Sequence, residues 1–423
     1  MNITRRSVLQ RTAALSLGAA ISTPHPLHAQ GAAVKNLRVA VVGLGRGMGH
    51  VQALLNLPGV EIAYLAEVDP SRLELALKVV RGKQPQPCRG LNDFRQCLED
   101  QSLDAVFIAT PNFWHTPMAL LAMQAGKHVY VEKPGSQNPH EAEMIVAGAK
   151  QYGRLVQMGN QRRTWMKQAI AALHGGAVGK LRYGRAFYYN SRPAVGQGAN
   201  KAAAGLDMEL WQGPVPEGSD IIPYIHYDWH WLWHWGNGEL GNNGIHHLDI
   251  LRWGLQVEYP ERVTYSGGRY AFDDKQETPD TGTAVFDFGG VGMEWVQSSC
   301  QARAAEKPLG ECVFYGDDGT FAINGSAWSI YNLKGVRTGE GKGEAGGDAA
   351  HIGNFLEAIR GGAQLNSPID EAQKSTMLCH LGNIAYRTNT VVRCDPKTGK
   401  LLNHPEGEKL WRRQYRQGWE PKV

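Results

Sequence analysis

Several kinds of functional site are excluded by what this 423-residue chain lacks. Its six cysteines form no Cys-x-x-Cys pair and no metal-ligand spacing, so we expect no metal site. They are interpreted as reduced core residues, although Cys300 and Cys312 would be able to meet across adjacent strands. No apolar stretch reaches the roughly 20 residues of a membrane-spanning helix. No basic block stands in the folded region, which argues against nucleic-acid and lipid partners.

The charge of the chain is almost balanced. There are 44 Lys and Arg residues against 40 Asp and Glu residues, and three of the bases lie within the first 30 residues, which hold no acid. The remainder therefore carries 41 bases and 40 acids, a net charge of +1. With 42% hydrophobic and 20% charged residues, this is an ordinary globular composition, and the length suits two domains. We expect a small-molecule substrate.

The first 30 residues have the features of a targeting segment. Arg5 and Arg6 precede an apolar stretch from Ala13 to Ile21, and Pro24 to Ala29 follow it. This arrangement resembles a twin-arginine export signal. We therefore expect export to the periplasm, with no integral membrane span after signal cleavage. Because this route carries folded proteins, it suggests a cofactor that is loaded in the cytoplasm.

From residue 36 to 158, short β-branched runs alternate with helical stretches, which is typical of a parallel Rossmann sheet. The predicted strands are 37–42, 60–66, 105–110, 127–132 and 155–158, and the predicted helices are 50–57, 71–81, 116–125 and 140–152. Residues 159–423 form a predicted α+β domain with a large, mostly antiparallel, open-faced sheet. Its predicted strands are 182–189, 262–270, 281–288, 291–299, 311–315 and 319–323, and its predicted helices are 351–360 and 371–388. The glycine-rich stretch from Gly335 to Gly347 is predicted to be a mobile surface loop.

A glycine-rich turn joins the first predicted strand to a helix start. Gly43 permits the tight turn, and Gly45 allows the backbone to approach a pyrophosphate, while Met48 stands where the fingerprint has its third glycine. Glu67 ends the second strand, where a carboxylate is expected to bind the ribose hydroxyls. A carboxylate there favours NAD over NADP, although Arg46 and Arg72 leave NADP open.

Two motifs at strand ends carry a resemblance to a known family. Thr110-Pro-Asn-Phe-Trp-His115 follows one strand, and Glu132-Lys133-Pro134 follows the next. With the stretches 159–162, 244–249 and 380–387, they resemble the Gfo/Idh/MocA family of oxidoreductases. The resemblance implies a sugar-like substrate between the nicotinamide and the open-faced sheet, and a homodimer or tetramer. It also implies that the dinucleotide is bound by Gly43, Gly45, Arg46, Met48, Glu67, Thr110, Asn112, His115, Glu132 and Lys133.

The predicted chemistry is hydride transfer from a carbinol carbon. The hydroxyl proton must leave as well, so a base is needed within hydrogen-bond reach of the oxygen, and His246 is the candidate. Lys133 is predicted to stabilise the alkoxide or relay its proton. Members of this family commonly have Asp four residues before this histidine, whereas this chain has Asn242. An amide orients a substrate but cannot take a proton. We expect Asp249 to be structural.

The segment from Tyr227 to Glu239 holds four tryptophans and two histidines. Aromatic faces stack on sugar rings, so the segment is interpreted either as a wall of a carbohydrate pocket or as an interface belt. His230 and His234 have i, i+4 spacing, but no Glu follows the first of them, so we expect no zinc site there. The candidate substrate-binding residues are Gln161, Arg162, Trp233, His234 and His247.

Three hypotheses follow from the sequence. The first is an NAD-dependent oxidoreductase that acts on a secondary hydroxyl of a sugar, cyclitol or glycoside. Because no free nicotinamide pool exists outside the cytoplasm, the cofactor of an exported enzyme is expected to stay bound and be recycled. The alternative is therefore an NAD-dependent glycosidase or lyase that acts through a transient keto-sugar with no net redox change. The third hypothesis, a non-catalytic sugar-binding protein, is the least favoured.

Overall fold

The computed structural model describes residues 35–196, 204–219, 221, 225–344 and 346–423. The predicted export signal lies outside these residues. Among the described residues, no helix has the length and apolarity needed to cross a membrane. The strands are β1 (Leu37–Val42), β2 (Val60–Ala66), β3 (Arg89–Leu91), β4 (Ala105–Ile108), β5 (His128–Val131), β6 (Val156–Met158), β7 (Leu181–Tyr189), β8 (Arg262–Gly268), β9 (Thr281–Asp287), β10 (Gly292–Ser298), β11 (Cys312–Gly316), β12 (Gly319–Asn324), β13 (Ala327–Asn332), β14 (Arg337–Lys342) and β15 (Val392–Arg393).

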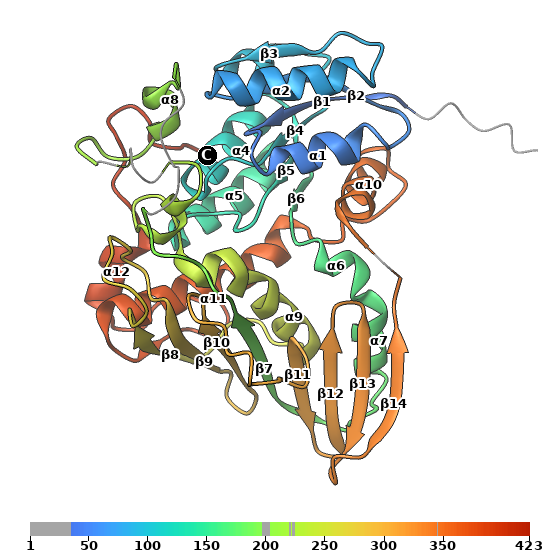
Figure 1. Cartoon of the computed structure of the whole chain (residues 1–423), viewed down its shortest axis with the longest axis vertical. Coiled ribbons are helices and arrows are strands. Elements are labelled where there is room, and N and C mark those ends of the chain that lie inside the picture. The colour runs from blue at the N-terminus through green and yellow to red at the C-terminus, as the bar shows by residue number, and fades with distance from the viewer. Residues whose placement is uncertain (1–34, 197–203, 220, 222–224, 345) are drawn as a thin grey trace, which may run out of the picture. The chain divides into compact units, whose positions relative to one another are not determined.

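The helices connect and cover these strands (Figure 1). The α-helices are α1 (Gly47–Leu54), α2 (Pro70–Arg81), α3 (Arg95–Leu98), α4 (Asn112–Gln124), α5 (Pro139–Tyr152), α6 (Arg162–Trp165), α7 (Lys167–His174), α8 (Met208–Gln212), α9 (Ile245–Leu255), α10 (Asp348–Ile359), α11 (Ile369–Thr388) and α12 (Pro405–Trp411). A 3-10 helix, η2, spans Asp228–Trp231, and a π-helical turn, η3, spans Leu240–Gly244.

The first sheet is the predicted Rossmann sheet. Its six strands are all parallel, in the order β3-β2-β1-β4-β5-β6. The central strands β1 and β4 are apolar along nearly their whole length, as strands that are covered on both faces must be. Because parallel strands all end at one edge, the residues that follow β1, β2, β4 and β5 come together there.

Local sequence sets the ends of the covering helices. Asp69 caps α2 by accepting hydrogen bonds from the backbone N–H groups of Ser71 and Arg72, and Pro70 occupies the first helical position. Asn138 and Pro139 begin α5 in the same way, and Gly153 ends it in the left-handed conformation. All six predicted helices begin one to four residues earlier than predicted. Among them, α1 starts at Gly47 inside the glycine-rich turn, and α4 starts at Asn112 directly after Pro111.

The second sheet has nine strands in the order β14-β13-β12-β11-β7-β10-β9-β8-β15. All neighbours are antiparallel except β7 and β10, which confirms the predicted fold class. The predicted loop from Gly335 to Gly347 is wrong in part, because β14 occupies residues 337–342 and pairs with β13. Its sequence has no apolar residue, so only its pairing with β13 makes it a strand.

Segments late in the chain complete both halves. Helix α10 packs its Ile352, Phe355 and Leu356 into the core formed by β1, β2 and β4. Helices α9 and α11 contact each other and cover one face of the second sheet (Figure 1). All six cysteines are free, so Cys300 and Cys312 form no disulfide.

Candidate active site

A cavity of about 440 Å³ lies at the carboxyl edge of the Rossmann sheet. Most of the residues predicted to bind the dinucleotide line it: Gly43, Gly45, Arg46, Glu67, Thr110, Asn112, His115, Glu132 and Lys133. They follow four different strands, so the parallel sheet brings them together, as the sequence predicts. Met48 is absent from the lining, and its side chain packs against the apolar core around β1 instead.

The glycine-rich turn leaves room for a ligand. Gly43 has φ +83°, and a Cβ there would lie 2.7 Å from the carbonyl oxygen of Ala109, so no other residue fits. A carboxylate oxygen of Glu67 accepts a hydrogen bond from the backbone N–H of Leu44 at 2.7 Å, which fixes the turn against β2. Burial raises the pKa of Glu67, against the hydrogen bonds that it accepts. The turn, the carboxylate and the cavity fit the pyrophosphate and ribose of a dinucleotide.

Glu132 is a buried carboxylate that ties several elements together. One of its oxygens accepts hydrogen bonds from Arg46 Nε at 3.1 Å, His50 Nε2 at 2.9 Å and Gln161 Nε2 at 3.2 Å. Although burial opposes ionisation, His50, Arg46 and Lys133 hold the pKa of Glu132 well below its usual range. Arg46 also forms an ion pair with Asp348, in which Nη1 and Nη2 each donate to one carboxylate oxygen, at 2.7 and 2.6 Å. Arg46 therefore links the glycine-rich turn to α10, besides lining the cavity.

Two residues of the 110–115 motif hold the strand ends in place. The ring nitrogens of His115 lie 2.5 Å from the carbonyl oxygen of Pro134 and 2.8 Å from that of Thr110, so this ring clamps the two motifs together. Asn112 donates to the side-chain oxygen of Asn237 at 2.9 Å, and Asn237 in turn donates to the carbonyl oxygen of Gln137. This buried amide chain joins the Rossmann edge to the segment that leads into α9.

Lys133 points from the cavity toward the π-turn η3. Its Nζ donates to the backbone oxygen of Asn242 at 2.7 Å and to the Asn242 side-chain oxygen at 3.1 Å. Burial lowers the pKa of Lys133, while the charges of Glu132 and Glu239 oppose that shift. The lysine therefore already contacts the position at which this chain has an amide in place of a carboxylate.

His246 follows Asn242 by four residues, in the first turn of α9. Its Nδ1 is buried and has no hydrogen-bond partner within the described part of the chain. Burial, with Lys133 as the largest charge, lowers the pKa of His246 well below its ordinary value, so the ring is neutral at pH 7. A neutral imidazole with a free nitrogen can accept a proton. His246 and Asn242 are not in the cavity lining, which ends at Lys133 on this side.

Glu239 is a residue that the sequence analysis did not single out. It is 2% exposed, and one of its oxygens accepts a hydrogen bond from Asn243. Burial raises its pKa, while Arg192 and Lys133 act in the opposite direction. In the sequence, the position of Glu239 just before the Asn242 turn is the only sign that it belongs to the site. Its burial cannot be predicted from composition.

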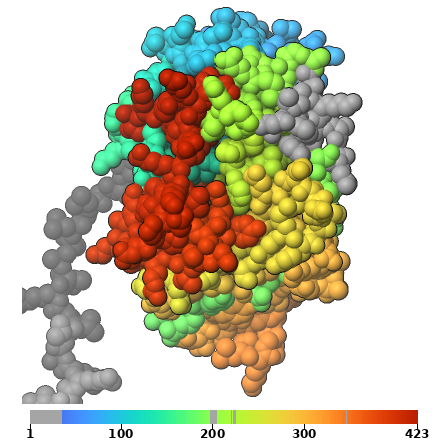
Figure 2. Space-filling model, turned by 90° about the vertical axis from the view of Figure 1, so that its left-hand side faces the viewer, coloured from blue at the N-terminus to red at the C-terminus, as the bar shows by residue number. Residues whose placement is uncertain are grey.

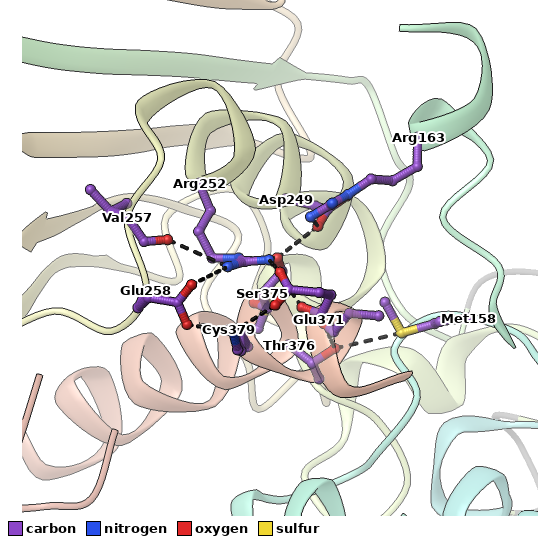
Figure 3. Close-up of polar contacts among 12 residues, drawn as sticks. Met158, Arg163, Asp249, Arg252, Val257, Glu258, Glu371, Ser375, Thr376 and Cys379 are labelled. Atoms are coloured by element: carbon purple, nitrogen blue, oxygen red, sulfur yellow. Dashed lines mark hydrogen bonds and ion pairs between the residues drawn. The ribbon is translucent and has the colours of Figure 1, made fainter. Parts of the chain in front are cut away.

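Asp249 is structural, as expected (Figure 3). It is 1% exposed and accepts two hydrogen bonds from Arg163, at 2.7 and 2.8 Å. Ser375 on α11 donates to it at 2.7 Å and also accepts a hydrogen bond from Arg252. This network fixes α9 against α6 and α11, and therefore sets where His246 stands.

Three of the predicted substrate residues lie around α9 and outside the cavity. Gln161 is bound to Glu132, and Arg162 forms an ion pair with Glu311 at 2.5 Å. Nδ1 of His247 lies 3.4 Å from the Trp295 indole nitrogen. Burial, followed by the charge of Arg162, lowers the pKa of His247 well below its ordinary value. Their role in binding substrate stays a prediction.

The aromatic segment presents different residues on its two sides. Trp229 and His230 line the 440 Å³ cavity, and their rings are stacked with their centroids 3.6 Å apart. Burial lowers the pKa of His230 to about 3. The predicted substrate residues Trp233 and His234 line other hollows, because η2 ends at Trp231 and the chain turns there. His230 and His234 therefore do not share a helical face.

Other cavity residues had weaker signals or none. Arg72, Asn92, Trp211, His226 and Tyr227 line the cavity. The sequence points to Arg72 and to the aromatic segment, whereas Trp211 lies in the short helix α8 and Asn92 and His226 lie in loops, so their positions depend on tertiary packing. Among the described residues, no group of three or more His, Cys, Asp or Glu side chains is arranged to hold a metal ion.

Comparison with known proteins agrees with this geometry. Residues 37–160 match the family described as "Oxidoreductase family, NAD-binding Rossmann fold", and residues 166–322 match the "GFO/IDH/MocA C-terminal domain". Together the two matches span more than half of the chain. The chain belongs to the Gfo/Idh/MocA family. The cofactor of its Rossmann domain is therefore NAD, as predicted.

Two curated relatives of the chain have glycosidase names. The chain is 29% identical over 206 residues to a "Glycosyl hydrolase family 109 protein" of Saccharopolyspora erythraea, covering 44% of this chain and 45% of that protein. It is 30% identical over 193 residues to an "Alpha-N-acetylgalactosaminidase" of Shewanella oneidensis, covering 42% of each. The matches thus span less than half the length of these curated relatives.

A solved structure shows the same fold across both domains. The WlbA dehydrogenase of Bordetella pertussis, in complex with NADH and UDP-GlcNAcA, has a TM-score of 0.64. It is 19% identical and covers 85% of this chain and 99% of that one. At this identity, the likeness supports the Gfo/Idh/MocA architecture alone.

Proposed function

We propose that this chain is an NAD-dependent glycosidase that oxidises a sugar hydroxyl transiently and restores it, with no net redox change. The observation that carries the proposal is the arrangement of Lys133 and His246. Lys133 lines the dinucleotide cavity and binds the Asn242 turn. His246 follows this turn, and its buried Nδ1 has no partner among the residues that the structure describes. A buried polar atom without a partner costs about 1–3 kcal/mol, which a ligand hydrogen bond would offset.

The residues divide the proton chemistry. NAD held by the glycine-rich turn, Glu67 and Lys133 would supply the hydride chemistry, which is removal of a hydride from the carbinol carbon and its later return. The hydroxyl proton passes to a base, and we assign that role to His246, whose Nδ1 has no hydrogen-bond partner among the described residues. The Lys133 ammonium stabilises the oxygen that becomes negative, and its lowered pKa helps it to relay the proton.

Glycoside cleavage follows from the ketone. The ketone acidifies the neighbouring C–H, so a base can remove that proton while the bond to the leaving oxygen breaks, and the departing oxygen takes up a proton. Water then adds its hydroxyl to the anomeric carbon and its proton to the neighbouring carbon, and the ketone is reduced back. The glycosidase names of the curated relatives favour this outcome over net oxidation.

The test uses the purified full chain with nitrophenyl N-acetylhexosaminides and no added cofactor. We expect nitrophenol release that depends on the bound NAD, together with wash-in of solvent deuterium at the carbon beside the anomeric centre. Lys133→Met and His246→Asn should each lower the rate about 10²- to 10⁴-fold without loss of folding. A keto-sugar product with stoichiometric cofactor reduction would show a net oxidoreductase instead. Turnover that survives both variants would overturn the proposal.

Localisation and assembly are also proposals. We propose that the chain is exported to the periplasm through its twin-arginine segment and assembles as a homodimer or tetramer. An Arg5→Lys, Arg6→Lys double variant should stay in the cytoplasm in cell fractionation. Analytical ultracentrifugation measures the assembly, and a purely monomeric protein at micromolar concentration would contradict that part.

A further inference from the structure

The far side of the aromatic segment faces a second hollow, which we call the Arg387 hollow. It consists of two adjoining cavities, of about 540 and 470 Å³, that share Trp233 and Arg387. The C-terminal end of α11, strand β8 and the residues after α12 surround it. Figure 2 shows the red C-terminal segment beside the yellow-green and yellow segments on this face. No residue of the hollow takes part in the chemistry proposed above.

Aromatic rings form one wall of the hollow. The ring centroids of Trp233 and Tyr386 lie 6.3 Å apart. The ring of Tyr265 contacts that of Tyr386 edge-on, with 5.3 Å between the centroids. Tyr270, which is 72% exposed, extends the wall toward solvent. Aromatic faces of this kind stack on the C–H faces of sugar rings, while the hydroxyl groups of tyrosines bond to the sugar hydroxyls.

The hollow also contains the guanidinium of Arg387, which forms no ion pair within the described residues, although the carboxylate of Glu277 lines the same hollow. Arg387 lies over the Trp233 ring at 4.8 Å. Among the described residues, nothing accepts a hydrogen bond from its side chain, and its nearest acidic influence is Glu277. The carboxylate of Glu277 is already bound to the backbone N–H of Trp233 at 2.6 Å. Burial lowers the pKa of Arg387, as expected for a cation withdrawn from water without a partner.

The other charges of the hollow are mostly paired. Lys409 binds Glu406, and Arg413 binds the buried Glu141. Arg412, like Arg387, makes no ion pair or side-chain hydrogen bond with the described part of the chain. The hollow therefore offers two guanidinium groups that are unpaired within the described residues, Arg387 beside the aromatic wall and Arg412 in the adjoining cavity, together with the carboxylate of Glu277. Arginine binds carboxylate and sulfate groups with two parallel hydrogen bonds, and a stacked arginine is already oriented for this.

We propose that the Arg387 hollow binds an acidic sugar, one that bears a carboxylate or a sulfate group. The ring stacks beside Trp233 and Tyr386, and its anionic group pairs with Arg387. The site is independent of the dinucleotide cavity, although both are walled by the same segment: Trp229 and His230 face the cavity, and Trp233 faces the hollow. Gln137, which donates to the carbonyl oxygen of Trp233 at 2.8 Å, holds the segment between them.

Isothermal titration calorimetry on the full chain tests the proposal. The probes are a tetragalacturonate, a sulfated galactose tetrasaccharide and a neutral galactose tetrasaccharide. We expect at least one anionic probe to bind at least tenfold more tightly than the neutral one, with an affinity that falls as salt rises. The anionic probe that binds identifies carboxylate or sulfate as the recognised group.

Two variants locate the binding. Arg387→Gln should weaken binding at least tenfold. Arg185→Gln is the matched control, because Arg185 also lies over a ring, that of Phe187 at 4.6 Å, but is paired with Glu294 on the sheet. This control should bind as the wild type does. Failure of every anionic probe, equal binding by the neutral probe, or equal affinity in Arg387→Gln would each overturn the proposal. So would a self-association that Arg387→Gln abolishes, since the hollow would then be an interface between copies.

Discussion

Converting Asn242 to aspartate should change the acidity of Lys133 in a way that the structure allows us to estimate. The ammonium Nζ lies 3.1 Å from the Asn242 side-chain oxygen. A unit charge at that distance attracts the ammonium by about 5 kcal/mol at an effective dielectric constant of about 20. Withdrawing the new carboxylate from water costs several kcal/mol of this. We expect a net gain of about 1–2 kcal/mol, which weakens the acidity of Lys133 roughly tenfold.

The assay is the rate of reductive methylation of Lys133, followed by peptide mass spectrometry over a range of pH. Only the neutral amine reacts, so a raised pKa lowers the rate at pH 8, and Asn242→Asp should react about tenfold more slowly than the wild type. The matched control is Gln52→Glu, which adds the same charge on the exposed face of α1. If Asn242→Asp and Gln52→Glu methylate Lys133 at the same rate, the contact between Lys133 and Asn242 does not govern its protonation. Any rise in the Lys133 rate would refute the sign of the argument.

Two further predictions concern the fold and the cofactor. Asp249→Asn leaves the buried Arg163 without its charged partner, so the free energy of unfolding should fall by about 3–5 kcal/mol, as measured by urea unfolding followed by tryptophan fluorescence. The control is Asp287→Asn, which removes one partner of an exposed ion pair and should lower the free energy of unfolding by at most about 1 kcal/mol. Burial would raise the pKa of Asp249, but Arg163 holds it below its usual range, so this stabilisation is present above the unfolded pKa and is lost as pH falls through the folded one. Glu67→Gln should weaken NAD binding about tenfold or more and raise the ratio of NADP to NAD affinity, as measured by calorimetry. An unchanged ratio would show that Glu67 serves only to hold the Leu44 turn.

Much of the Rossmann half could be predicted because local sequence determines it. Strand β2 matches its predicted range, since apolar residues fill it and turn residues bound it. The motif residues after β1, β2, β4 and β5 meet at one cavity because parallel strands share their carboxyl edge. By contrast, β14 has no apolar pattern and depends on β13, so no local signal marks it. The position of α10 against β1 likewise depends on contacts between distant segments.

In the candidate site too, local motifs predict some features, whereas others depend on contacts between distant segments. Motifs placed Lys133 in the cavity, but they did not show which side of the aromatic segment faces it. Trp229 and Trp233 are four residues apart, and the end of η2 at Trp231 sends them to different hollows. That direction depends on the hydrogen bond from Gln137 and on Glu277, both distant in sequence.

The exchange of a carboxylate for Asn242 has a physical consequence for Lys133. An amide accepts the hydrogen bond from Nζ but adds no charge, so the lysine keeps a pKa lowered by burial. The nearby negative charges are those of Glu132, shared with Arg46 and His50, and of Glu239, three residues before Asn242. Neither forms an ion pair with Lys133 among the described contacts, so both act on it only through space. A lysine whose pKa is lowered gives up a proton more readily than an ordinary lysine, and a redox-neutral cycle requires such a transfer at its oxidation and the reverse transfer at its reduction.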